Sequence, residues 1–411
     1  MAIVNEYNNT TAIYHGGVSY SSVYKNLVQY FPDPRTPPTP PQDERIDIEI
    51  EPQNGGTIYI PTNASYATGD TVSYDWDISI DWGTAVRYTG TATQWTTAYI
   101  SISWYTAHQT YTVRITPHWV PTYWWAKAFR YKRGQRYRQD LKRIIYDSSY
   151  MWYADSATNT WDYFRAWQYD WCDALLNIPD EVLPSTVTTI WNYFRYRQYR
   201  WCSVIDTPSV EVMPNTVTSV WTNFRDSQYS WCYHLTTAAN EVISSGISTI
   251  PNDFRAWQYY NCYDITTVGN EVLPSNITSI WNNFRGMQYD WCSDLTSTAI
   301  EILPNTVVSI GTYFRRQQYR DCTSLVEIKW IKDLAIGNTN YRTSQFGGCD
   351  SNKTIKVFSD VWYNWNEPSY DSSLKNIYIT QVQVPSAYLQ NFIDTTNKPR
   401  VNITDSKFIW Y

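Results

Sequence analysis

The stretch from Trp191 to Val220 reads WNYFRYRQYRWCSVIDTPSVEVMPNTVTSV, and the next thirty residues repeat its frame as WTNFRDSQYSWCYHLTTAANEVISSGISTI. The thirty-residue block occurs six times between Trp161 and Asn340, and a seventh, incomplete copy ends near Cys349. Each of the six complete copies has Phe-Arg, then Gln-Tyr, then Cys eight residues after the Phe. A fixed period of this length predicts stacked units that bury their apolar faces only against their neighbours. The chain is therefore predicted to form a solenoid.

Two columns of the repeat are predicted to fill the core of the coils. They are the phenylalanines Phe164, Phe194, Phe224, Phe254, Phe284 and Phe314, and the cysteines Cys172, Cys202, Cys232, Cys262, Cys292 and Cys322. The total of seven cysteines is odd, and the chain has no Cys-x-x-Cys motif. Buried thiols are therefore expected, rather than a metal or redox site.

Each coil is predicted to contain a short helix and two short strands. Phe164, Gln168, Cys172 and Leu176 are four residues apart, the spacing of one helix face. Residues of good N-cap type precede it in the six blocks: Asp162, Asn192, Thr222, Asn252, Asn282 and Thr312. Residues 181–183 and 187–190 are rich in β-branched side chains, which predicts strands that pair in parallel about 4.8 Å apart along the stack.

Positions that differ from block to block are expected to face solvent. They are the pairs that begin at Ala166, Tyr196, Asp226, Ala256, Gly286 and Arg316. The second residues of these pairs form a column that we call the ridge: Trp167, Arg197, Ser227, Trp257, Met287 and Gln317. Two interpretations stay open, because exposed positions tolerate many residues, whereas Trp, Tyr, Arg and Ser are also frequent in recognition surfaces. The ridge is the candidate ligand-binding surface.

The glutamate column Glu181, Glu211, Glu241, Glu271 and Glu301 is the only ordered set of carboxylates. Stacked like charges repel, so the arginines that follow each Phe are expected to compensate them. Five equivalent glutamates do not form the asymmetric carboxylate pair of a glycosidase, and the four histidines lie in unrelated segments. No catalytic residue, cofactor or metal site is predicted.

Tryptophan occupies two columns in which glycine is the expected residue. The residue before the Cys is Trp171, Trp201, Trp231, Asn261, Trp291, Asp321 or Gly348, at a helix end that calls for the left-handed conformation. A second column reads Trp161, Trp191, Trp221, Pro251, Trp281 and Gly311. Either these tryptophans form an aromatic binding face, or many are encoded by UGA codons that the source organism reads as glycine.

Composition and charge exclude several classes of function. The net charge of −6 gives no general attraction to nucleic acid or anionic membrane, and no apolar run approaches the roughly 18 residues of a membrane span. Met1–Tyr7 lacks the features of a signal peptide. One basic, aromatic segment, residues 124–153, is of a kind that can bind nucleic acid. A helix over Gln139–Tyr146 is expected instead, with Leu141, Ile144 and Ile145 capping the first coil, so no nucleic-acid partner is predicted.

Six segments are predicted along the chain. A β anchor over 1–30 has a hairpin at His15-Gly16-Gly17, and a Pro-rich linker covers 31–44. Alternating apolar residues predict a small antiparallel β-sandwich over 45–118. The solenoid then has an N-terminal cap (119–160), the repeats (161–350) and a C-terminal cap (351–411).

The repeat resembles the leucine-rich repeats of BspA-like bacterial surface antigens. The resemblance is carried by Thr189-Ile190, by Asn192-Tyr193-Phe194, by the Cys eight after the Phe, and by Leu three after the Cys, as in Cys322-Thr323-Ser324-Leu325. It implies a mainly β fold with a right-handed, leucine-rich-repeat-like solenoid of strand and short-helix coils. The inserted Arg-x-x-Gln-Tyr is a departure that lengthens the coil.

Three shorter stretches resemble other modules. Asp81-Trp82-Gly83 with Tyr111–Ile115 is similar to PKD-like modules, and residues 382–389 are similar to the strand, Pro and helix that close BspA-type arrays. Residues 12–28 resemble the N-terminal attachment piece of bacteriophage virion proteins.

These resemblances imply a non-enzymatic display or adhesion protein on a virion or cell surface. A phage tail-fibre or receptor-binding component that recognises a host-surface glycan or protein is the first hypothesis, anchored to a virion or cell envelope through residues 1–30. A bacterial BspA-like adhesin and a polysaccharide-degrading enzyme are the alternatives. The sequence predicts neither the ligand nor the oligomeric state.

Overall fold

A computed structural model of the chain describes residues 14–15, 18–19, 45–53, 55–62, 71–93, 98–117, 138–147, 158–160, 162–179, 181–183, 185–209, 211–239, 241–269, 271–299, 301–304, 306–330, 344–349, 353–357, 379–384 and 408–410. The chain forms two compact units, Met1–Asp43 and Glu44–Tyr411. In the first unit, β1 (Tyr14–His15) and β2 (Val18–Ser19) pair antiparallel, with Tyr14 opposite Ser19. The predicted hairpin at Gly16-Gly17 is therefore confirmed.

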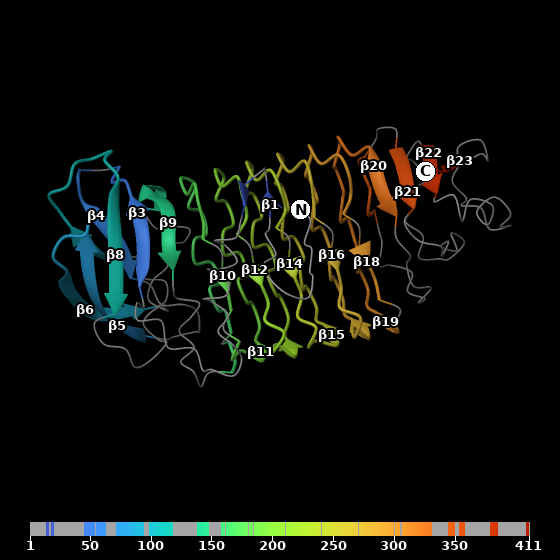
Figure 1. The fold of residues 1–411 in the computed structure, drawn as a ribbon. Coiled ribbons are helices and arrows are strands. Elements are labelled where there is room, and N and C mark those ends of the chain that lie inside the picture. The colour runs from blue at the N-terminus through green and yellow to red at the C-terminus, as the bar shows by residue number, and fades with distance from the viewer. Residues whose placement is uncertain are drawn as a thin grey trace. The chain divides into compact units, whose positions relative to one another are not determined.

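The second unit begins with two antiparallel sheets (Figure 1). The larger sheet has the order β6-β5-β8-β3-β9, and the smaller sheet pairs β4 with β7. The bounds of the larger sheet are β3 (Ile46–Ile50), β5 (Thr71–Ile80), β6 (Val86–Thr93), β8 (Tyr111–Pro117) and β9 (Leu141–Asp147), and those of the smaller are β4 (Ile58–Thr62) and β7 (Ala98–Ile102). Ile48, Trp76 and Val113 of the larger sheet share one apolar core with Ile60 and Ile100 of the smaller.

The helix predicted over Gln139–Tyr146 is wrong. A short 3₁₀ turn, η2 (Arg138–Asp140), leads into strand β9, which pairs antiparallel with β3. Leu141 and Ile144 are buried as expected, but Ile145 is 46% exposed. The pattern of apolar residues is compatible with a helix and with a strand. A strand forms because the edge of β3 supplies hydrogen-bond partners for its backbone.

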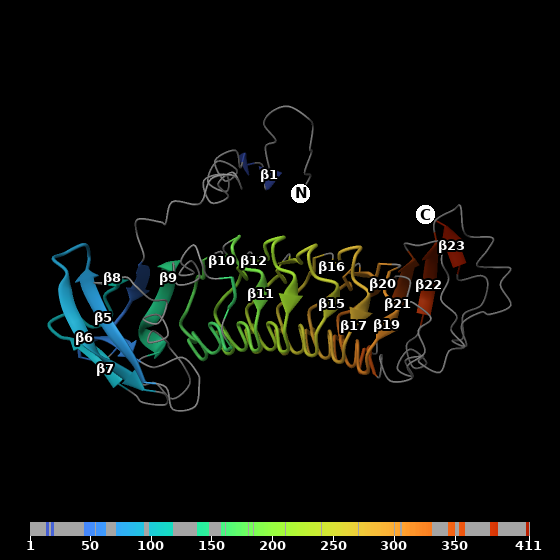
Figure 2. The same ribbon diagram turned by 90° about the horizontal axis from the view of Figure 1, so that it is seen from below.

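Each coil contains two two-residue strands, and most of these pair in parallel with the equivalent strand of the next coil (Figure 2). The first of these strands are β10 (Glu181–Val182), β12 (Glu211–Val212), β14 (Glu241–Val242), β16 (Glu271–Val272) and β18 (Glu301–Ile302), and the second are β11 (Thr189–Ile190), β13 (Ser219–Val220), β15 (Thr249–Ile250), β17 (Ser279–Ile280) and β19 (Ser309–Ile310). Glu181 lies opposite Glu211, and Ile190 lies opposite Val220. The register therefore advances by one thirty-residue repeat for each coil, as predicted.

The short helix predicted in each coil is also wrong, because the segment from Tyr163 to Cys172 is a series of turns. The N–H groups of Ala166, Gln168 and Cys172 donate to carbonyls three residues earlier, at 3.0–3.3 Å. Those of Trp167, Tyr169 and Trp171 donate to the next coil, at 2.7–2.9 Å. Leu176, which was placed on the inner face, is 54% exposed. The described part of the chain has no α-helix, and the fold is mainly β.

The residues expected to cap these helices bond to the neighbouring coil instead. Asp162 Oδ1 accepts the N–H of Asn192 at 3.0 Å, and Asn282 Oδ1 accepts the N–H of Thr312 at 2.7 Å. Their side-chain oxygens satisfy a backbone donor, which is the role of an N-cap. The donor that they satisfy belongs to the next repeat, so these side chains join the coils together.

Two apolar clusters run through the stack. One contains the Phe column together with the Val and Ile of the second strands, and the other contains the Tyr, Cys and Leu or Ile columns. All six phenylalanines and all six cysteines of the predicted core are buried. Successive rings stack with centroids 5.6 Å apart at Tyr169–Tyr199 and 5.4 Å apart at Phe164–Phe194.

A buried polar column lies where the chain passes from one apolar cluster to the other. Gln228 Nε2 lies 3.3 Å from Gln198 Oε1, and Arg165 Nε donates to Gln168 Oε1 at 2.6 Å. Each arginine also lies over the preceding phenylalanine, for example with Arg225 Cζ 4.7 Å from the Phe224 ring centroid. Hydrogen bonds and cation–π contacts thus offset the desolvation of these groups.

The first coil continues directly from the larger sheet. Leu176 N–H donates to Lys142 O at 2.8 Å, and Arg143 forms a parallel bridge with Asn177. Strand β9 therefore covers the end of the stack, which is the role that was predicted for a helix.

The seventh repeat keeps the coil frame, and parallel strands follow it. Phe346 and Cys349 are buried, and Tyr319 N–H donates to Gln345 O at 2.9 Å. A parallel sheet of order β20-β21-β22-β23 is formed by β20 (Glu327–Trp330), which precedes this repeat in the chain, and by β21 (Lys353–Val357), β22 (Ile379–Val384) and β23 (Phe408–Trp410), which follow it. The helix expected after Pro385 lies outside the described residues.

Candidate recognition surface

The six ridge residues occupy equivalent positions from coil to coil, and the main-chain N–H groups of the first five bond to the next coil. Trp167, Arg197 and Ser227 donate to Tyr196, Asp226 and Ala256 carbonyls at 2.9–3.0 Å, and Met287 donates to Arg316 O at 2.7 Å. All six have left-handed backbones, with φ between 53° and 57°. Five of the side chains are half-buried and Ser227 is buried.

Ridge side chains are held by contacts with their neighbours rather than standing free in solvent. The Trp167 ring stacks on Tyr163 with centroids 5.8 Å apart and meets the edge of Tyr196 at 5.1 Å. Arg197 Cζ lies 4.6 Å from the Tyr196 ring centroid. These contacts fix the orientation of the side chains, so the ridge is a preorganised surface.

The residue before each ridge position does not consistently face solvent, which corrects the expectation that both members of each pair are exposed. Ala166, Asp226 and Ala256 are buried, whereas Tyr196 and Arg316 are half-buried. The turn geometry explains the difference, because it directs alternate side chains inward.

Asp226 is a buried carboxyl group within this column. Ser227 Oγ lies 2.6 Å from Asp226 Oδ1, and Asn223 Nδ2 donates to Oδ2 at 3.0 Å. Burial raises the pKa of Asp226 to about 7, although both hydrogen bonds act to lower it. The group therefore titrates near neutral pH without forming part of a catalytic pair.

Ion pairs that the sequence analysis missed connect adjacent coils. Arg200 binds both carboxylate oxygens of Asp170 at 2.9 Å, and Arg320 binds those of Asp290 at 2.9 and 2.7 Å. Burial still raises the pKa of Asp290 to about 7. The signal was present in the sequence, because an acid and an arginine stand thirty residues apart in the same column.

The predicted compensation of the glutamate column by arginines stays a prediction. The backbones of the glutamates are in register, as for Glu211 and Glu241. Their side chains lie outside the described residues. The arginines are buried, and the Arg195 side chain is among the largest fully buried side chains of the structure.

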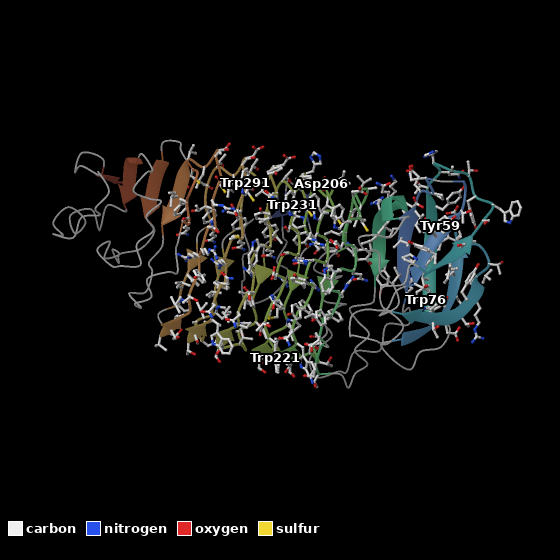
Figure 3. The ribbon with its side chains drawn as sticks, turned by 180° about the vertical axis from the view of Figure 1, so that it is seen from behind. Tyr59, Trp76, Asp206, Trp221, Trp231 and Trp291 are labelled. Atoms are coloured by element: carbon white, nitrogen blue, oxygen red, sulfur yellow. The ribbon has the colours of Figure 1, made fainter. Side chains whose placement is uncertain are left out.

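Tryptophans lie along two edges of the stack (Figure 3). Trp231 and Trp291 lie near Asp206 on one edge, and Trp221 lies on the opposite edge. Trp171, Trp201 and Trp231 stack with centroids 4.6 and 4.3 Å apart. On the other edge, Trp191, Trp221 and Trp281 are 39–49% exposed.

The structure brings together no constellation typical of a catalytic or metal centre among the residues it describes. Within these ranges, no three His, Cys, Asp or Glu side chains are placed to hold a metal ion. No helix of the described ranges is long and apolar enough to cross a membrane. His234 Nδ1 lies 2.9 Å from Asp264 Oδ2 in an exposed pair that joins two coils.

Comparison with known proteins gives little further information. No protein-family model and no curated protein matches the chain. Among solved structures, it is similar to a leucine-rich cell surface protein from Faecalibacterium prausnitzii A2-165, with 15% sequence identity over 66% of this chain and 73% of that chain and a TM-score of 0.20. A likeness of this size supports no argument about function, so the proposals below rest on the geometry of this chain.

Proposed function

We propose that this chain is a non-enzymatic recognition protein displayed on a surface, and that the ridge contacts its ligand. In this proposal the coils form a right-handed, leucine-rich-repeat-like solenoid, preceded by a β-sandwich of PKD-like type. The observation that carries the proposal is the contrast between constant buried columns and one column in which six positions hold five different residue types, on a backbone that is hydrogen-bonded from coil to coil. Recognition surfaces combine a rigid frame with varied side chains in this way.

The ridge is chemically suited to a glycan or a protein surface. Trp167 and Trp257 offer aromatic area, and Arg197 and Gln317 offer hydrogen-bond donors. Aromatic and arginine side chains supply much of the binding energy in protein interfaces. The ligand proposed is therefore a glycan or protein of a host surface.

A non-enzymatic role is supported by what the titratable groups do. The cysteines are buried and donate to carbonyls, as Cys232 Sγ does to Tyr199 O at 3.1 Å. Burial raises the pKa of Cys232 well above its usual value, so its thiol is not poised as a nucleophile. The Asp170 and Asp290 carboxylates are held in ion pairs between coils.

Two settings fit this proposal, a bacterial cell surface and a virion. The described residues do not separate them, because the short β1–β2 hairpin is compatible with either kind of anchor. The genes beside this one would separate them, since virion assembly genes favour a tail-fibre component and secretion genes favour an adhesin.

The test replaces the ridge residues with serine, which Ser227 already provides at this left-handed position. The variant carries Trp167→Ser, Arg197→Ser, Trp257→Ser, Met287→Ser and Gln317→Ser. A matched control changes the outward row at the second strands, with Thr188→Ser, Thr218→Ser and Thr278→Ser. Both are compared with wild type on a printed glycan array and on candidate host cells, after thermal melts show that they fold.

We expect wild type and control to bind alike and the ridge variant to lose at least tenfold in affinity. Unchanged binding by the ridge variant would show that the ligand contacts another face. Release of reducing ends from host polysaccharides by wild type would overturn the non-enzymatic proposal itself.

A further inference from the structure

Eight tryptophans of the described residues have a backbone in the left-handed region, which L-residues other than Asn and Asp rarely adopt. Their φ angles are 62° at Trp82, 83° at Trp104, 55° at Trp167, 71° at Trp171, 64° at Trp201, 67° at Trp231, 53° at Trp257 and 64° at Trp291. Glycine adopts this conformation freely because it has no Cβ. Tryptophan has a Cβ, so the left-handed conformation costs it about 1–2 kcal/mol.

The column before the Cys is left-handed in every coil and in the seventh repeat. Where the residue is not Trp it is Asn261, Asp321 or Gly348, with φ of 59°, 58° and 75°. Asn, Asp and Gly are the three residue types that tolerate the left-handed region best. The backbone thus imposes one requirement on the column, and only the tryptophans fail to meet it.

The ridge provides an internal comparison. Trp167 and Trp257 are also left-handed, but they share their column with Arg197, Met287 and Gln317, which have no preference for that conformation. The ridge column therefore shows no selection for glycine. Of these two columns, only the one before the Cys shows that selection.

The antiparallel sheets supply independent instances outside the repeat. The Trp104 side chain is 100% exposed at a φ of 83°, so the indole gains no packing in return for the strained backbone. Trp104 precedes Tyr105, whose N–H donates at 2.8 Å to the carbonyl of the left-handed Gly56. Trp82, which precedes Gly83, is 62% exposed.

Trp76 has the opposite environment. Its side chain is fully buried in the core of the larger sheet, with its ring centroid 4.8 Å from that of Tyr74. Its backbone is part of strand β5. A glycine here would leave a large cavity, so this position requires the indole.

We propose that Trp82, Trp104, Trp171, Trp201, Trp231 and Trp291 are encoded by UGA, and that the source organism inserts glycine at these codons. Trp76 is then encoded by UGG and is a true tryptophan. The natural protein has glycine at the end of each of these turns, and the stacked indoles of that edge are absent from its surface. The ridge residues, including Trp167 and Trp257, are not among these positions.

The second tryptophan column is a different case. Trp191, Trp221 and Trp281 are not left-handed, and Pro251 occupies the same column, so the backbone angle gives no reason for glycine there. At Gly311 an added Cβ would lie 2.6 Å from the Asn282 backbone nitrogen, which indicates crowding rather than left-handed geometry. The proposal therefore assigns no codon to this column.

Two measurements on the protein as its source makes it test the proposal. The gene sequence gives the codons, and tandem mass spectrometry of tryptic peptides gives the residues. The peptide 226–255 contains Trp231 as its single tryptophan, and the peptide 46–87 contains both Trp76 and Trp82. The second peptide is thus its own control.

We expect UGA at the six codons, glycine at 231 and 82, and tryptophan with a UGG codon at 76. Tryptophan at 231 and 82 would overturn the proposal, as would UGG at the six codons. Glycine at 76 as well as at 82 would overturn the division that the structure makes between strained and buried positions.

Discussion

Replacing Trp104 with glycine should stabilise the antiparallel sheets. An L-residue in the left-handed region costs about 1–2 kcal/mol. The indole is 100% exposed, so the change removes no burial. The greater conformational entropy of glycine in the unfolded chain offsets about 0.5–1 kcal/mol of this gain. The expected net gain is about 1 kcal/mol, which corresponds to about a fivefold change in the equilibrium between closed and open states.

The assay is native-state hydrogen exchange at the Tyr105 amide, which donates to Gly56 O at 2.8 Å next to the mutated residue. Trp104→Gly should slow its exchange by about fivefold, for the reason given above. Trp104→Ala is the matched control, because it also removes the indole but keeps the Cβ that the left-handed backbone disfavours. Similar exchange in the glycine and alanine variants would refute the reasoning, because removal of the indole would then account for both.

Two further predictions concern the buried columns. Cys232→Ser should destabilise the chain by about 1–3 kcal/mol, because a more polar group is buried where the Cys232 side chain is fully enclosed. Equal denaturant midpoints for wild type and variant would contradict this prediction. The pKa of Asp226, raised to about 7 by burial, lies above its value in the unfolded chain, so protonation favours the fold and stability should fall as pH rises from about 4 through 7. Asp226→Asn should reduce this slope in thermal melts between pH 5 and pH 8, with Asp206→Asn, at an exposed carboxylate, as the control. An unchanged slope in Asp226→Asn would contradict the assignment.

The repeat period determined most of what could be predicted from the sequence. Side chains that recur every thirty residues, such as Phe224, Tyr229 and Cys232, are all buried. The parallel pairing of equivalent strands follows from the same period, because identical segments of adjacent coils align in register. The two short strands of each coil lie within the predicted ranges but are shorter, as in Glu181–Val182 and Thr189–Ile190 against the predicted 181–183 and 187–190.

The helices could not be predicted correctly, because the deciding partners lie in other coils. Phe164, Gln168 and Cys172 have helical spacing, and a helix would satisfy their backbone within one coil. In the stack, Trp167 N–H finds Tyr196 O at 2.9 Å and Trp171 N–H finds Arg200 O at 2.7 Å. Spacing within one repeat contains no information about acceptors thirty residues away.

Some signal for the turns was nevertheless present in the sequence. Asn223, Asp253 and Asn283 stand directly before the Phe, and each is left-handed in the structure. Asn and Asp are enriched in that region because their short polar side chains bond locally. The other three residues of this column are tyrosines, so the signal for the turns was present in half of the repeats.

The alternation of hydrogen-bond partners also accounts for the dependence of each coil on its neighbours. Within one coil, turns such as Ala166 N–H to Tyr163 O, 3.0 Å, satisfy only alternate residues. The residues between them, including left-handed Tyr163 and Trp167, bond to the next coil at 2.8–2.9 Å. In an isolated coil, the left-handed residues would lack the hydrogen bonds that offset the energetic cost of their backbone conformation. The conformation is therefore stable only in a stack. Glycine at positions 171, 201, 231 and 291 would remove one such left-handed L-residue from each of these four coils. This column, unlike the ridge, otherwise contains only Asn, Asp and Gly, which is why it is expected to contain glycine.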